Sequence, residues 1–371
     1  MKTHILNLII MIAFIAGLHH ALAQPTLTIT PAGNQALLSW PASATGYILQ
    51  STTNLTSQNW VTNNNSVNAI NGTNEVTISS GQGNLFFRLI GAAAPAGIVL
   101  IPAGSFTMGN SINDADLTDA TPTNVTMSAF YMDTNLVSYT QWQSVYNWAT
   151  NNGYGFANAG AGKAPNHPVH LVDWYDCVKW CNARSEQGGL PPVYYTDAGL
   201  TQVYVDGEVT PYVDWTATGY RLPTEAEWEK AARGGLSGQR FPWGNTISES
   251  QANYYGCTTC GYSYDLGPTG PNATFATGTQ PYTSPVGYFA ANGYGLYDMA
   301  GNLLEWCWDW YGTPYAGGTD PHGPATGGAR VMRGGNWNDG ARWSRCAARF
   351  SNVPVRTDTD QGCGFRCVRG L

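Results

Sequence analysis

The stretch NGYGLYDMAGNLLEWCWDW, residues 292–310, decides the fold expected for this chain. It holds three glycines, three carboxylates and three tryptophans. Glycine permits tight backbone turns, and each tryptophan brings a large apolar body with an N–H that needs a hydrogen-bond partner. The segment is too irregular for a long helix and too aromatic for a solvated loop. We therefore predict a buried, turn-rich organiser with a short helical turn around Met299–Trp306.

Two carboxylates of this stretch, Asp298 and Glu305, permit two interpretations. Together with backbone carbonyls near Gly301 and Leu303, they could surround a calcium ion, which prefers about six to eight oxygen ligands. The spacing is not that of an EF-hand loop. Alternatively, Asp298 caps a turn and Glu305 pairs with an arginine. Taken alone, these residues favour the second interpretation.

The first residues have the pattern of a secretion signal. Lys2 precedes an apolar run over 5–18, and Ala21–Ala23 is a small-residue cleavage pattern. The run is too short for a comfortable membrane span, and no later stretch approaches the needed length. We expect a soluble, exported protein, secreted or periplasmic, after removal of the signal peptide 1–23.

The charge balance argues against two classes of partner. Loss of Lys2 with the signal leaves sixteen Lys and Arg against twenty-four Asp and Glu, a net charge of −8. Only 11% of residues are charged and no basic block is present, so neither nucleic acid nor an anionic membrane is expected as a partner. The sequence carries no signal for an oligomeric state.

All eight cysteines follow the signal peptide: Cys177, Cys181, Cys257, Cys260, Cys307, Cys346, Cys363 and Cys367. An even number in an exported chain favours disulfides over free thiols or zinc. Cys257 and Cys260 form a C-x-x-C pair. We favour a structural bridge over a redox pair there, because no βαβ pattern surrounds it.

Two domains are predicted on either side of a linker. Residues 24–92 contain short alternating apolar runs between Asn, Gly, Pro and Ser clusters, a pattern typical of an all-β sandwich. It resembles a fibronectin type III-like module with Trp40 as its core tryptophan. The small-residue linker 93–97 follows. The second domain, 98–371, contains every cysteine and nearly all the tryptophans.

Three helices are predicted in the second domain. Residues 138–150 and 173–185 have apolar side chains at helical spacing, and Asp173 is a candidate N-cap. A third helix begins after Thr224 as N-cap and ends at Gly234. Few regular elements and many disulfide candidates indicate an irregular α+β fold.

Eight blocks keep a fixed order between residues 97 and 371: IPAGSFTMG (101–109), HPVHLVDWYD (167–176), GYRLPTEAEWEKAARGG (219–235), FPWGN (241–245), PVGYFAANGYGLYDMAGNLLEW (285–306), RVMRGGNW (330–337), RCAARF (345–350) and GFRCVRG (364–370). Together they resemble the formylglycine-generating enzyme, or sulfatase-modifying factor, family. The resemblance implies a C-type-lectin-related α+β fold with little regular secondary structure.

Active members of that family oxidise a cysteine of a sulfatase peptide to formylglycine, using molecular oxygen and a copper held by two cysteines. The resemblance places this C-x4-C pair shortly after an RGGS-type turn, which is Arg333–Asn336 here. Asp339 stands at the position of the first copper cysteine, and no second cysteine precedes Cys346. Copper(I) requires soft thiolates. Copper and formylglycine generation by this mechanism are therefore not expected.

The resemblance also implies metal and disulfide residues. Matches to a family calcium site are Asp298, Gly301, Leu303 and Glu305, and the start of a second site is resembled by Asn253 and Tyr254. Because of the match to the first calcium site, we now favour structural calcium over a turn cap and an arginine pair. Cys346 matches half of a family disulfide whose partner position is Ala232 here. The expected bridges are Cys181–Cys367, matching the family, Cys307–Cys346, a parallel Cys177–Cys363, and Cys257–Cys260.

A polar and aromatic ligand surface is expected where the family places its peptide groove: Arg333, Asn336, Trp337, Asp339, Arg342 and Trp343. Trp and Arg are frequent anchors of binding sites. Alternatively, Trp337 lies in the core and the arginines meet carboxylates such as Glu305. The favoured hypothesis is a non-catalytic binding module for a peptide, protein or glycan. The alternative is an oxidoreductase of this family with altered chemistry. A third interpretation makes residues 336–356 a target of sequence diversification.

Overall fold

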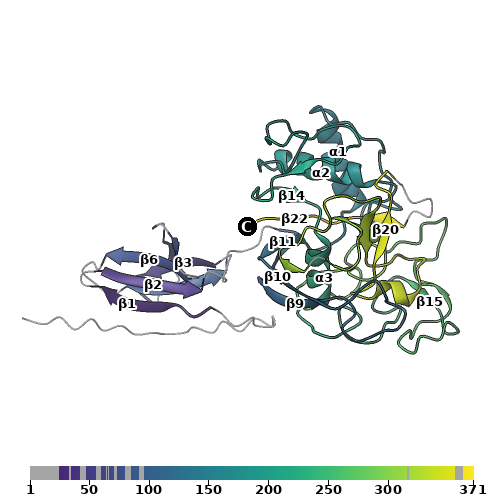
Figure 1. Cartoon of the computed structure of the whole chain (residues 1–371), viewed down its shortest axis with the longest axis horizontal. Helices are drawn as coiled ribbons and strands as arrows, with labels where there is room; N and C mark the ends of the chain where they lie inside the picture. The colour runs from purple at the N-terminus through teal and green to yellow at the C-terminus, as the bar shows by residue number, and fades with distance from the viewer. Residues whose placement is uncertain are drawn as a thin grey trace, which may run out of the picture. The chain divides into compact units, whose positions relative to one another are not determined.

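The computed structural model describes residues 25–371 except 33–34, 42–46, 56–59, 64, 66, 71–72, 80–84, 92–95, 316 and 356–361. The predicted signal peptide 1–23 and most of the predicted linker lie outside the described residues. The chain divides into two compact units, Met1–Ala93 and Ala94–Leu371 (Figure 1). None of the helices in the described part of the chain is both long and apolar enough to cross a membrane.

The N-terminal unit contains two antiparallel sheets, with strand orders β1-β2-β6-β5 and β4-β3-β7. The strands are β1 Thr28–Ala32, β2 Gln35–Pro41, β3 Tyr47–Thr52, β4 Val61–Thr62, β5 Asn68–Ile70, β6 Thr73–Ser79 and β7 Phe86–Gly91. Alternate residues of both sheets share one apolar cluster, in which Trp40 is 3% exposed. The prediction of Trp40 as a core residue is confirmed. Kinship with fibronectin type III modules stays a prediction.

The C-terminal unit mixes a few helices with many short strands. The strands are β8 Ile98–Ile101, β9 Gly104–Met108, β10 Thr123–Met127, β11 Phe130–Asp133, β12 Tyr194–Tyr195, β13 Tyr212–Val213, β14 Tyr220–Arg221, β15 Tyr255–Gly256, β16 Gly270–Pro271, β17 Leu304–Trp310, β18 Gly318–Thr319, β19 Arg330–Arg333, β20 Phe350–Asn352, β21 Cys363–Gly364 and β22 Val368–Arg369. They form sheets with the orders β14-β22-β11-β8, β20-β19-β17-β21 and β18-β10-β9, together with the pairs β12-β13 and β15-β16.

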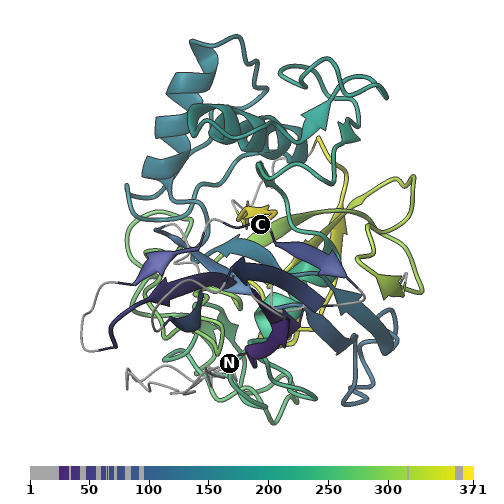
Figure 2. The same ribbon diagram turned by 90° about the vertical axis from the view of Figure 1, so that its left-hand side faces the viewer.

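The three predicted helices form: α1 Tyr139–Thr150, α2 Trp174–Gln187 and α3 Glu225–Arg233, with a short 3-10 helix η1 at Ala341–Ser344. The N-caps of α2 and α3 are Asp173 and Thr224, as predicted. Thr224 forms a complete capping box with Glu227, and Gly234 ends α3 at a left-handed φ of 56°. Helices α1 and α2 pack against each other (Figure 2).

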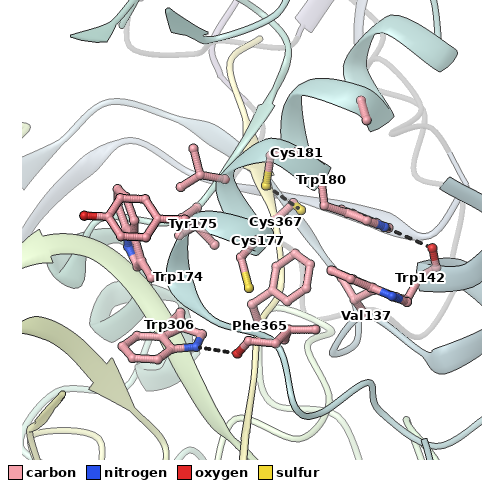
Figure 3. Packing of buried hydrophobic residues seen from close by; sticks show 14 of the residues in the cluster. Val137, Trp142, Trp174, Tyr175, Cys177, Trp180, Cys181, Trp306, Phe365 and Cys367 are labelled. Atoms are coloured by element: carbon pink, nitrogen blue, oxygen red, sulfur yellow. Dashed lines mark hydrogen bonds between the residues drawn. The ribbon is translucent and has the colours of Figure 1, made fainter. Parts of the chain in front are cut away.

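Stacked aromatic side chains form the core between α1, α2 and the end of the chain (Figure 3). The rings of Trp142 and Trp180 are parallel to within 2°, with centroids 5.8 Å apart. Phe365 presents its edge to both. Four of the core's indole N–H groups donate to carbonyls, among them Trp180 Nε1 to Trp142 O at 3.1 Å and Trp306 Nε1 to Val172 O at 3.3 Å. These four buried tryptophans therefore have a hydrogen-bond partner for the polar end of the ring.

The organiser is buried, as predicted, but its expected helical turn around Met299–Trp306 is wrong. Residues Leu304–Trp310 form the strand β17, which pairs antiparallel with β19 and parallel with β21. Tryptophans at 306, 308 and 310 recur with period two, the period of a strand. The turn signal holds only upstream, where Asp298 and Asn302 have φ values of 56° and 65°.

Candidate functional site

Half of the predicted ligand surface is buried. Arg333, Asn336 and Trp337 are 0%, 5% and 2% exposed, so the predicted surface role is wrong for these three. Trp337 packs with Leu136 and Leu303, which is the alternative considered for this residue. Arginine and tryptophan are common in binding sites, but their burial depends on partners elsewhere in the chain.

Arg333 is buried because glutamates of α3 neutralise it. Its Nη2 donates to Glu229 Oε2, and its Nε lies 3.6 Å from Glu225 Oε1. Glu229 also accepts from Gly109 N and from Arg233 Nη2, both at 2.7 Å. A buried charge is tolerated only when it is paired and hydrogen-bonded. This charge cluster links α3, β19 and the turn after β9.

The accessible part of the predicted surface surrounds η1. Arg342 is exposed, and its guanidinium carbon lies 4.4 Å from the ring centre of Trp343. The Trp343 ring in turn lies 4.3 Å from that of Phe350 on β20. Asp339 is half-buried, and its Oδ2 accepts from Asn336 N at 3.0 Å. Asp339 therefore orders the turn that precedes the exposed arginine and tryptophan.

Strand β20 is at one edge of the sheet β20-β19-β17-β21. Just beyond it, Val353 and Val355 are 47% and 53% exposed. An edge strand offers unpaired backbone groups, and extended peptides bind by adding a strand there. The edge of β20, its exposed valines, Trp343 and Arg342 together form what we term the η1–β20 surface.

The carboxylates proposed for calcium have protein partners. Glu305 accepts from Arg366 Nε at 2.7 Å and from Nη2 at 2.8 Å, the bidentate geometry of a strong ion pair. Asp298 Oδ2 accepts from Gly287 N at 2.7 Å, whereas its buried Oδ1 has no hydrogen-bond partner among the described residues. Burial raises the pKa of Asp298 to about 6. The fit to calcium is partial, because Asp298 Oδ1 is available but Glu305 would first have to leave Arg366.

The other residues of the two predicted calcium sites make hydrogen bonds of their own. Asn253 O accepts a backbone N–H at 2.7 Å, and the Tyr254 hydroxyl donates to Asp265 Oδ1 at 2.6 Å. The N–H of Gly301 donates to a backbone carbonyl at 2.8 Å, and Leu303 is fully buried. Within the described ranges, no three His, Cys, Asp or Glu side chains gather so that they could hold a metal. Calcium at either site stays a prediction.

One predicted disulfide is formed and another is close to forming. Cys257 and Cys260 are bonded, with Cα atoms 5.5 Å apart, which confirms the local bridge. The sulfurs of Cys181 and Cys367 lie 3.4 Å apart without a bond in the aromatic core (Figure 3). A disulfide needs about 2.05 Å. A small movement would therefore complete the Cys181–Cys367 bridge.

The remaining cysteines lie in apolar surroundings. Cys307 and Cys346 belong to one buried cluster, and Cys177 and Cys363 to another; both of these bridges stay predictions. Burial raises the pKa of the Cys346 thiol to about 12 and raises those of Cys177 and Cys307 well above their ordinary value. The thiolate is the reactive and metal-binding form. These thiols are consequently neutral at physiological pH.

Sequence reasoning missed Lys230 and the cavity beside it. Lys230 is 5% exposed and lines a cavity of about 680 Å³ formed by α3 and the sheet β18-β10-β9. In the sequence it stands in a helix rich in charged residues, which is typical of a solvated face. Only the inward position of α3 buries it, so no local signal could have identified it.

Comparisons with known proteins agree on one family. The model of the sulfatase-modifying factor enzyme 1-like domain matches residues 89–371. The formylglycine-generating enzyme of Thermomonospora curvata is 35% identical over 296 residues, which cover 73% of this chain and 93% of the relative. A protein named chaperone protein LppX, from Paenibacillus barcinonensis, is 34% identical over 248 residues, covering 65% of this chain and 78% of the relative.

Solved structures extend the comparison. Treponema denticola variable protein 1 is 28% identical with a TM-score of 0.57, covering 78% of this chain and 97% of its own. The structure of CarF is 28% identical with a TM-score of 0.54, covering 75% of this chain and 99% of its own. These proteins carry names as different as enzyme, chaperone and variable protein. Membership of the family alone therefore does not show whether this chain is a catalyst or a binding protein.

Proposed function

This chain belongs to the sulfatase-modifying factor enzyme 1-like family, and from that premise we propose that it is an exported, non-catalytic binding module for a peptide, protein or glycan, stabilised by disulfides. One observation carries the proposal. Asp339 stands where the resemblance places the first copper cysteine, and every cysteine outside the Cys257–Cys260 bridge is at most 1% exposed.

Cysteine chemistry argues against oxidation by the family route. That route requires a pair of thiolates that can reach both copper and a peptide. The Asp339 carboxylate is a hard ligand and is held by a backbone N–H. The nearest cysteine downstream, Cys346, is buried, and burial raises its pKa to about 12. Neither group supplies a soft, accessible ligand.

The η1–β20 surface supports a binding role. Arg342 is exposed above Trp343, and this pair lies beside an edge strand followed by two exposed valines. Such a surface combines a charged anchor, an aromatic anchor and an edge strand to which an extended peptide can add. It suits a peptide or a protein loop that adds to the sheet. A glycan would stack on the same aromatic pair.

Binding arrays of peptides and glycans test this proposal on the purified chain lacking residues 1–23. We expect Arg342→Ala to weaken capture of the best ligand at least tenfold, because Arg342 is exposed and makes no ion pair with another described residue. Tyr288→Ala is the matched control, since Tyr288 is 56% exposed in a different aromatic cluster. Equal capture by the wild type and Arg342→Ala would contradict a binding role for this surface.

The alternative is an oxidoreductase of the family with altered chemistry. Its support is the family itself, which includes formylglycine-generating enzymes 31–35% identical to this chain. Oxygen uptake is the discriminating measurement, with copper and a cysteine-containing peptide as reactants. If the wild type and Arg342→Ala both take up oxygen stoichiometrically, the protein is an enzyme and the binding-module proposal is wrong. No uptake leaves the binding proposal as stated.

A further inference from the structure

The carboxylate of Asp298 is buried and has no cation partner among the described residues. Asp298 is 6% exposed and takes part in no ion pair with them. Arg366, whose charge acts on Asp298, donates two of its five N–H bonds to Glu305 and the other three to backbone carbonyls. A buried carboxylate is costly unless it is paired. Asp298 therefore requires a positive charge that the described side chains do not supply.

The side chain of Asn135 has a second buried oxygen without a partner. Asn135 Oδ1 accepts no hydrogen bond from a described residue. The orientation of its amide is fixed by Thr134, whose hydroxyl donates its one proton to Gly97 O at 3.2 Å. That hydroxyl can then only accept from Asn135, and Asn135 Nδ2 donates to it at 3.1 Å. Oδ1 is therefore the end of the amide that faces away from Thr134.

Three contacts place Asn135 beside Asp298. The N–H of Tyr297 donates to Thr134 O at 2.9 Å, which joins the two neighbouring residues of the chain. Asp298 Oδ2 accepts from Gly287 N at 2.7 Å. A Cβ added to Gly287 would lie 2.8 Å from Asn135 Oδ1. Both side chains thus contact the same glycine, and the lack of a side chain at Gly287 leaves room for their oxygens.

Two backbone carbonyls of the same turn are also without partners. Gly301 and Leu303 are buried, and no N–H group of a described residue donates to either carbonyl oxygen. Buried carbonyls are nearly always hydrogen-bonded. Together with Asp298 Oδ1 and Asn135 Oδ1, they make four buried oxygens that lack a donor. Carboxylate, amide and carbonyl oxygens are the ligands that calcium prefers.

Glu305, which the family resemblance supplies as a further ligand, does not fit this set. Both of its oxygens are held by Arg366, at 2.7 and 2.8 Å. We propose that this chain binds a calcium ion through Asn135 in place of Glu305, together with Asp298 and the carbonyls of Gly301 and Leu303. Glu305 and Arg366 remain a closed ion pair. The site is independent of the η1–β20 surface, so either proposal can fail without the other.

The exchange of Glu305 for Asn135 has a consequence for affinity. It leaves Asp298 as the single charged ligand, and calcium affinity falls as the number of charged ligands falls. We therefore expect a dissociation constant of about 0.1–1 mM, the range of extracellular calcium modules.

Isothermal titration calorimetry with calcium chloride tests the proposal on the chain lacking residues 1–23. Asp298→Asn identifies the heat that belongs to this site, because binding that persists in it comes from elsewhere. Asn135→Leu keeps the size of the side chain but removes the oxygen, and we expect it to weaken calcium binding at least tenfold. Asn152→Leu is the matched control, since Asn152 is exposed and its Nδ2 only donates to Trp148 O at the end of α1.

Asn135→Asp is a second variant that keeps the shape and adds a charged ligand. We expect it to bind calcium at least tenfold more tightly than the wild type. Its melting temperature should be lower than that of the wild type in EDTA, because two buried carboxylates then repel each other, and should rise further on adding calcium. A residue with only a structural role would not tighten calcium binding. This variant also decides the matter should Asn135→Leu fail to fold.

Three outcomes overturn the proposal. The first is equal calcium binding by the wild type and Asp298→Asn. The second is binding by Asn135→Leu that is as tight as that of the wild type. The third is no tightening in Asn135→Asp. Loss of binding in Asp298→Asn with wild-type affinity in both Asn135 variants would restore Glu305 as the ligand.

Discussion

Replacing Glu229 by glutamine should unfold the C-terminal unit more easily than any exposed acid-to-amide change. Glu229 is fully buried, and its two oxygens hold Arg233 and Arg333 as well as the N–H of Gly109. Glu229→Gln keeps the shape but leaves two buried guanidinium groups undercompensated. Breaking a buried ion pair from one side costs about 3–5 kcal/mol. For a unit of this size, that lowers the melting temperature by on the order of 10 °C.

The assay is urea unfolding followed by tryptophan fluorescence, with calorimetry for the melting temperature. Asp116→Asn is the matched control. Asp116 also pairs with an arginine, Arg345, but its side chain is 35% exposed and Arg345 keeps Asp114. Exposed ion pairs contribute about 0–1 kcal/mol, so the control should lose no more than that. A loss below about 1 kcal/mol in Glu229→Gln as well would refute the reasoning, because the cluster would then behave as if solvated.

The remaining predictions concern the core, the thiols and the two unusual aspartates. Arg330→Lys should destabilise by about 1–2 kcal/mol in the same urea assay, because the guanidinium carbon lies 3.7 and 3.5 Å from the rings of Trp174 and Trp310; an unchanged midpoint would contradict a stacking role. Mild oxidation should join Cys181 to Cys367, detected by peptide mapping without reductant, and should raise the melting temperature; a persistent pair of free thiols would contradict it. Burial raises the pKa of Asp309 to about 8, above its unfolded value, so its contribution is fully present below about pH 4 and is lost as the pH rises toward 8. Melting temperature should therefore fall over that interval in the wild type and less in Asp309→Asn, and parallel curves would reject the assignment. Structural calcium predicts that millimolar calcium raises the melting temperature of the wild type but not of Asp298→Asn; no rise in the wild type rejects it.

The predictions from sequence were correct for features that depend on residues close together in the chain. The cap at Thr224, the end of α3 at Gly234 and the local bridge Cys257–Cys260 all depend on groups within one or a few turns of the chain. Their geometry follows from capping and from short loop closure. These features could be read correctly without any tertiary information.

The predictions from sequence were wrong where the spacing of side chains or a partner far away in the chain decides the structure. The glycine-, carboxylate- and tryptophan-rich stretch 292–310 was predicted to be turn-rich, with a helical turn around Met299–Trp306. The tryptophans at every second position instead lie on a strand, 304–310. Arg333 was expected at the surface because the resemblance places a peptide groove there, but its glutamate partners lie more than one hundred residues earlier in the sequence. Long-range pairing of this kind leaves no local pattern. Lys230 was missed for the same reason.

The side chains of GYRLPTEAEWEKAARGG, residues 219–235, divide between two roles. Within α3, Glu225 and Glu229 hold the buried arginines, while Lys230 turns to the cavity on the other side. None of these contacts involves Asp339, whose turn precedes η1. The charge cluster is therefore built from residues other than Asp339, the position that the resemblance aligns with a copper cysteine. The proposed binding role would use this separation, because exposed loops on a rigid frame are the arrangement that binding sites require.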